Sequence, residues 1–120
     1  MQAPRPTALV VDDDPALRML MRVNLELEGF TVAEGATVEE AEASVRASRP
    51  DVVLLDVHLA GGVETLSMLA RLRAQGIPVA LVTGSVDVDE YRSAADAVLS
   101  KPFTPQALVG LAQRLARVER

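Results

Sequence analysis

The sequence predicts an α/β protein with a parallel sheet, because short apolar segments alternate with segments of helical periodicity. Five apolar segments of four or five residues lie at 7–11, 30–34, 52–55, 79–82 and 97–100. Short apolar runs of this kind suit strands that are buried on both faces. Parallel strands need crossover connections, which the helices between them supply. We therefore expect a doubly wound five-stranded sheet covered by helices on both faces.

Each helix of the first half has a recognisable start or stop. The first is expected over residues 15–28, with Pro15 in its first turn and Gly29 ending it. Thr37-Val38-Glu39-Glu40 has the form of a capping box and opens a helix through Ala47. We interpret the methionines of the helical segments as core filler rather than as a partner groove: Met19, Met21 and Met68.

The second half continues the alternation with one weak element. Leucines at helical spacing predict a helix over residues 64–74, and Asp87 to Ala95 is at most a short helix. A final helix is expected to start at Thr104-Pro105, with a threonine cap and a proline in the first turn, and to reach Val118.

Length and composition indicate one soluble domain. The chain has 120 residues, of which 49% are hydrophobic and 24% charged, and its net charge is −5. An acidic chain without a long apolar run argues against contact with nucleic acid or membrane. Residues 1–6 contain two prolines and are expected to form a flexible N-terminal arm before a domain over 7–120. A cytoplasmic location is the default expectation.

Polar side chains follow four of the predicted strands at the point where each strand ends. The acids Asp12 and Asp13 follow the first strand, Asp56 the third, Thr83 the fourth and Lys101 the fifth. In a parallel sheet with helical crossovers, ligands bind beyond the carboxyl ends of the strands. The sequence therefore predicts that these five side chains converge at one edge.

This set of residues can support phosphoryl transfer. Clustered carboxylates repel one another unless they share a cation, and Mg²⁺ suits all-oxygen ligands. Asp56 could then act as a carboxylate nucleophile that forms an aspartyl phosphate. The Thr83 hydroxyl and the Lys101 ammonium would each contact a phosphoryl oxygen. Lys101 is the only lysine beside eleven arginines, which suggests that a compact ammonium is needed there.

These residues resemble the receiver domains of two-component response regulators, over residues 7 to about 118. The resemblance is carried by an acid pair, a central aspartate, a threonine and a lysine followed by proline: Asp12, Asp13, Asp56, Thr83, Lys101 and Pro102. It implies a flavodoxin-like sheet of strand order 2-1-3-4-5.

The resemblance also implies roles for single residues at a Mg²⁺ site. Asp13 and Asp56 would be direct ligands, Asp12 would act through water, and His58 would supply its backbone carbonyl. Gly84 fits the small residue that leaves room for the phosphoryl group.

Three positions depart from the family pattern. Val98 stands where receivers often place an aromatic residue that moves inward on phosphorylation. Thr83 and Lys101 are 18 positions apart, which is short for the family, so we expect a short or irregular fourth helix. The loop over residues 59–64 lacks the family's proline, which predicts a more mobile loop.

The resemblance implies a signalling module rather than a turnover enzyme. A histidine kinase or a phosphotransfer protein would phosphorylate Asp56, and phosphorylation would alter binding to a downstream partner. No output domain is expected within this chain, and homodimerisation remains open. Two alternatives stay open: a degenerate receiver that binds partners without phosphorylation, and a haloacid-dehalogenase-like phosphatase that uses Asp12 as its nucleophile.

Overall fold

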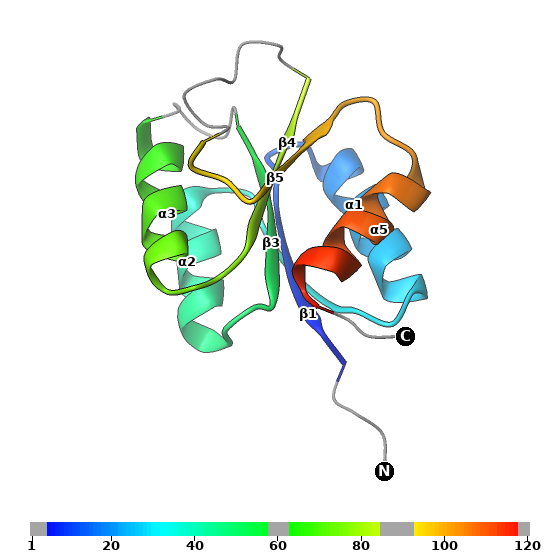
Figure 1. The fold of residues 1–120 in the computed structure, drawn as a ribbon, viewed down its shortest axis with the longest axis horizontal. Coiled ribbons are helices and arrows are strands. Elements are labelled where there is room, and N and C mark those ends of the chain that lie inside the picture. The colour runs from blue at the N-terminus through cyan, green and yellow to red at the C-terminus, as the bar shows by residue number, and fades with distance from the viewer. Residues whose placement is uncertain (1–4, 58–62, 85–92, 118–120) are drawn as a thin grey trace.

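A computed structural model of the chain describes residues 5–57, 63–84 and 93–117 and contains the expected parallel sheet (Figure 1). Its elements in chain order are β1 (Thr7–Val11), α1 (Pro15–Leu27), β2 (Thr31–Gly35), α2 (Val38–Ala47), β3 (Val52–Asp56), α3 (Val63–Ala74), β4 (Val79–Thr83), β5 (Ala97–Ser100) and α5 (Pro105–Leu115). The strand order is β2-β1-β3-β4-β5 and every pairing is parallel. The flavodoxin-like, doubly wound fold is thus confirmed.

Helices cover both faces of the sheet. In Figure 1, α2 and α3 lie on one side of the strands, and α1 and α5 lie on the other. Successive strand residues point to opposite faces, so Leu9 and Val53 join the core beneath α2 and α3. Their neighbours Val10 and Leu54 join the core beneath α1 and α5. Two buried cores therefore hold the central strands rigidly between helical layers.

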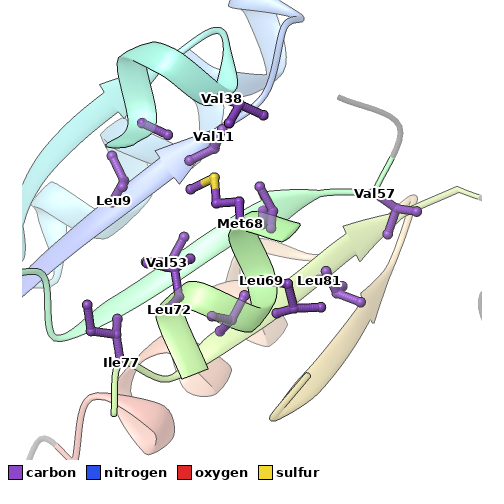
Figure 2. Packing of buried hydrophobic residues seen from close by; sticks show 13 residues of the cluster. Leu9, Val11, Val38, Val53, Val57, Met68, Leu69, Leu72, Ile77 and Leu81 are labelled. Atoms are coloured by element: carbon purple, nitrogen blue, oxygen red, sulfur yellow. The ribbon is translucent and has the colours of Figure 1, made fainter. Parts of the chain in front are cut away.

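The core beneath α2 and α3 is shown from close by in Figure 2. Met68, Leu69 and Leu72 of α3 are at most 2% exposed, and they belong to the same cluster as Val53 and Leu81 of the sheet. Each such side chain contributes about 1.5–3 kcal/mol by leaving water. This packing fixes the positions of β3 and β4, whose ends carry Asp56 and Thr83.

The predicted helix starts are present. Asp14 caps α1, and its carboxylate accepts hydrogen bonds from the amides of Ala16 and Leu17 at 3.0 and 3.4 Å. Thr37 caps α2 by accepting from the Glu40 amide at 3.1 Å.

In return, the Glu40 carboxylate accepts from the Ala36 amide at 2.8 Å, one residue before the position that a strict capping box would use. Thr104 caps α5, with Pro105 as its first residue. Local side-chain chemistry therefore decides where these helices begin.

Three local expectations were wrong. The final helix ends at Leu115 rather than reaching Val118, because Ala116 forms its C-cap and Arg117 has a positive φ of 57°. The second strand begins at Thr31 rather than at Phe30, whose ring is instead buried in the core beneath α1 and α5. Met19 is 55% exposed and is not core filler, whereas Met21 and Met68 are buried. Met19 belongs to a group of large apolar side chains that α1 leaves exposed: Met19, Leu20, Val23 and Leu27.

The connection between β4 and β5 contains no helix among the residues that the structure describes. Residues 93–96 form a turn and a bend, and residues 85–92 lie outside the described part. Val98 is partly buried and packs, with Ala94 and Ala95, against the core beneath α2 and α3. The expected fourth helix is therefore not helical over its described end.

Other expectations fall outside the described residues. They concern His58, the loop over residues 59–62, and all but the last two residues of the proposed arm. Among the helices that the structure describes, none combines the length and the apolar character needed to cross a membrane.

Candidate functional site

The four strands that end in polar residues bring them to one edge of the sheet. Asp12 directly follows β1, Asp56 is the last residue of β3, and Thr83 is the last residue of β4. Lys101 directly follows β5, and its backbone amide donates to the Thr83 carbonyl at 2.7 Å. The convergence that the topology predicted is therefore present, and adjacent strands hold its members in register.

Three of these side chains form a cluster of carboxylates. Each of Asp12, Asp13 and Asp56 offers an oxygen, and these oxygens lie within 4.8 Å of one another. Asp12 and Asp56 are 1% and 5% exposed, whereas Asp13 is exposed. Buried like charges this close are unfavourable unless a cation compensates them.

The pKa of Asp12 reflects both its burial and this repulsion. Burial raises the pKa of its carboxyl above the ordinary value of 3.8, and the nearby Asp56 carboxylate raises it further. The Asp14 amide, which donates to Asp12 Oδ1 at 2.9 Å, lowers the pKa, and so does the Lys101 ammonium. In the protein without a metal ion, ionisation of Asp12 is therefore less favourable than ionisation of an aspartate in water.

Lys101 partly compensates the acids. Its Nζ lies 3.5 Å from Asp12 Oδ2 and 3.8 Å from Asp56 Oδ1, with the side chain 28% exposed. Among the residues that the structure describes here, one ammonium faces three carboxylates, which leaves two excess negative charges when all are ionised. A divalent cation would balance them, and carboxylate oxygens are the ligands that Mg²⁺ prefers. The donor set and its charge therefore fit Mg²⁺.

Thr83 and Gly84 complete the described part of the site. Thr83 is 1% exposed, so its side chain is buried at the end of β4. A Cβ at Gly84 would lie 3.8 Å from the Cβ of Lys101 and 4.0 Å from its Cδ. This is ordinary van der Waals distance, so glycine leaves open the space beside the lysine stem.

Asp14, the third acid of the run, is separate from the carboxylate cluster. Its side chain caps α1. His58, expected to supply a carbonyl, lies outside the described residues. The structure thus brings together Asp12, Asp13, Asp56 and Lys101.

Sequence reasoning missed two residues that contact this region. Arg18 Nη1 of α1 donates to the backbone carbonyl of Asp12 at 2.8 Å. Arg18 Nε also donates to Glu34 Oε1 of β2 at 3.0 Å. The sequence around Arg18 gives no local signal for these contacts. They depend on how α1 packs beside β2.

A protein-family model and several curated relatives match the sequence of this chain. The family model described as the response regulator receiver domain matches residues 8–113. The DNA-binding response regulator MtrA of Mycolicibacterium smegmatis is 38% identical over 125 aligned positions, which cover all of this chain and 54% of that protein. The probable transcriptional regulatory protein TcrX of Mycobacterium tuberculosis is 35% identical over 86% of this chain and 46% of its own length. The chain thus spans about half the length of these curated relatives.

Solved structures show the same domain at similar length. A CheY-like receiver domain protein from Methanospirillum hungatei superposes with a TM-score of 0.85 at 27% identity, covering 94% of each chain. The receiver domain of NtrX from Brucella abortus has a TM-score of 0.83 at 28% identity, covering 93% of this chain and 99% of its own. Receiver domains of this kind are generally signalling modules rather than turnover enzymes. The chain belongs to the response regulator receiver domains of two-component systems.

Proposed function

We propose that this receiver is a phosphoacceptor whose Asp56 takes a phosphoryl group from a phosphohistidine in a Mg²⁺-dependent reaction. The observation that supports it is the position of Lys101 Nζ, between Asp12 and Asp56 and beside a carboxylate cluster with two excess negative charges. The donor would be a histidine kinase or a phosphotransfer protein, the partners with which receiver domains interact. The reaction would take place in the cytoplasm.

The covalent change in the acceptor step involves the carboxylate of Asp56 and the leaving group of the donor. An Asp56 oxygen forms a bond to phosphorus while the phosphorus–nitrogen bond of the phosphohistidine breaks. The donor imidazole keeps the electron pair of that bond and takes up a proton. Such transfers depend on positioning and charge stabilisation more than on covalent help from the protein.

The surrounding residues have separate roles in this proposal. Asp12, Asp13, Asp56 and the His58 carbonyl would hold Mg²⁺, which when bound neutralises charge on the phosphoryl oxygens. Lys101 would pair with one phosphoryl oxygen. Its Nζ lies 3.8 Å from Asp56 Oδ1, so a small movement of its flexible stem suffices. The Thr83 hydroxyl would donate to another oxygen.

Intact-mass measurement after incubation with Mg²⁺ and acetyl phosphate tests the proposal. We expect the wild type to gain the mass of one phosphoryl group and Asp56→Asn to gain none. EDTA should abolish the gain in wild type, because three carboxylates without a cation repel the donor. Asp51→Asn is a matched control, since Asp51 lies at the opposite end of β3, and this variant should be phosphorylated like wild type.

The same samples separate the alternatives. Steady hydrolysis of a phosphate ester that is lost in Asp12→Asn and kept in Asp56→Asn would support a phosphatase instead. A folded wild type without any mass gain would support the degenerate receiver. That second candidate is favoured by Val98, an aliphatic residue packed in the core where an aromatic switch was expected.

Phosphorylation must also have an output. The relatives MtrA and TcrX are DNA-binding or transcriptional regulators, and this chain spans about half of their length. We propose that residues 7–120 form the receiver after an arm of residues 1–6, and that phosphorylation alters the binding of a downstream protein. A second copy of the chain is one such partner.

A further inference from the structure

We infer that Arg18 is a positioning residue for the acid pair, because it holds the peptide group that joins Asp12 to Asp13. The inference rests on the proposed metal site and adds a residue of α1 to the groups that determine its affinity. Asp12 and Asp13 can hold one cation together only if that peptide has a defined orientation.

The contacts of Arg18 link three elements. Nη1 donates to the Asp12 carbonyl at 2.8 Å, and Nε donates to Glu34 Oε1 at 3.0 Å. The Arg18 side chain is 20% exposed, so both contacts are partly shielded from water. A guanidinium is a planar, rigid fork of donors, so anchoring one nitrogen on Glu34 of β2 orients the nitrogen that reaches Asp12.

The backbone of Asp12 is consequently held from two sides. Its amide donates to the carbonyl of Gly35 at the end of β2 at 3.1 Å, and its carbonyl accepts from Arg18. Its own Oδ1 accepts from the Asp14 amide at 2.9 Å, which shapes the turn into α1. Asp13, the exposed acid, lies between these fixed points. Without Arg18, the Asp12 carbonyl loses its charged donor and the Asp12–Asp13 peptide can rotate.

Arg22 provides a matched control on the same helix. Its Nε lies 2.9 Å from Glu34 Oε2, and its Nη1 lies 3.3 Å from Glu26 Oε1. It therefore shares with Arg18 the charge, the helix and the Glu34 partner, and its side chain is 31% exposed. The difference between the two arginines is that Arg18 donates to the Asp12 carbonyl, whereas Arg22 pairs with Glu34 and Glu26.

A positioning role and a simple charge effect of Arg18 predict opposite changes in cation affinity when the side chain is removed. Removing a positive charge near a cation site should strengthen cation binding by relieving repulsion. Removing a positioning group should weaken binding, and loss of such outer contacts typically lowers metal affinity by about 10–100-fold. The direction of the change in Arg18→Ala therefore distinguishes the two effects.

Titration calorimetry of the metal-free full chain with Mg²⁺ tests the inference without any phosphorylation. We expect the Kd to rise about 10-fold in Arg18→Ala and to stay within about twofold in Arg22→Ala. Arg18→Lys keeps the charge but replaces the fork with one nitrogen, and should show a smaller rise. The inference is overturned if Arg18→Ala binds Mg²⁺ as tightly as wild type or more tightly, or if Arg22→Ala loses as much affinity.

A second measurement does not depend on the metal. In the metal-free protein, NMR-detected exchange of the Asp14 amide reports the turn that Arg18 holds in place. We expect faster exchange in Arg18→Ala and Arg18→Lys and no change in Arg22→Ala. If wild type binds no Mg²⁺, the proposed metal site fails, yet this comparison still decides the role of Arg18. Unchanged exchange in Arg18→Ala contradicts that role.

Discussion

Asp12 shows how a residue placed for a binding site can lower the stability of the fold. Its carboxylate is buried near Asp56, and Lys101 and the Asp14 amide stabilise the charge only in part, so its pKa is raised. The presence of aspartates after a strand was readable from the sequence. The burial that makes the charge unfavourable was not, because it depends on which segments pack around the strand end.

Asp12→Asn should stabilise the metal-free protein at neutral pH, because it removes a charge whose folded-state pKa is raised. Between 3.8 and the higher folded value, the folded state binds more protons than the unfolded state, so the free energy of unfolding falls as pH rises. The unfavourable contribution is complete above the folded pKa and absent below 3.8. Urea unfolding in EDTA at pH 7 should therefore give a higher midpoint for Asp12→Asn than for wild type.

Two conditions sharpen this comparison. The advantage of Asp12→Asn should shrink as the pH falls toward the ordinary aspartate range, and Mg²⁺ should raise the midpoint of wild type more than that of the variant. A variant that is less stable than wild type at pH 7 in EDTA would contradict the account of Asp12.

Each helix start is decided by a few adjacent residues, which explains why the starts of α1, α2 and α5 could be predicted from short motifs. The exposed face of α1 could not be predicted in this way. Leucine and methionine at helical spacing indicate an apolar stripe, yet Met19 and Leu27 are 55% and 76% exposed. The width of the buried stripe depends on how closely α5 and the sheet approach, which is a tertiary property.

Asp14→Ala should destabilise the protein by about 1 kcal/mol, because the first turn of α1 loses the carboxylate that accepts from Ala16 and Leu17. Asp14→Ser should recover most of the loss, since serine is also a good N-cap. Chemical denaturation monitored by circular dichroism measures both. The Mg²⁺ affinity of Asp14→Ser should equal that of wild type, and a large loss there would mean that the third acid belongs to the metal site.

The molecule as a whole has two cores separated by the sheet, and their packing keeps the strand ends in place. Leu108 of α5 is fully buried in the core beneath α1 and α5, whereas Leu27 of α1 is mostly exposed. The alternation of strands and helices predicted this arrangement, because each face of a parallel sheet must be covered. The lack of helix over residues 93–96, just before β5, was suggested only by the short spacing between Thr83 and Lys101.

Leu108→Ala should lower the free energy of unfolding by about 2–5 kcal/mol, because it removes transfer energy and leaves a cavity between α5 and the sheet. The exposed counterpart Leu27→Ala should cost well under about 1 kcal/mol. Denaturant titration of both variants checks the prediction, and equal losses would contradict the two-layer core. At temperatures where Leu108→Ala remains folded, its phosphorylation with Mg²⁺ and acetyl phosphate should match wild type.

The sequence by itself determined the parallel α/β sheet and the placement of Asp12, Asp13, Asp56, Thr83 and Lys101 at strand ends. These features are local, since each depends on an apolar run and on the residue that follows it. The tertiary structure decided the rest: the burial of Asp12, the reach of Lys101 between two carboxylates, and the contact of Arg18 with the Asp12 carbonyl. Such contacts depend on the packing of segments far apart in the chain, and no spacing along one segment encodes them.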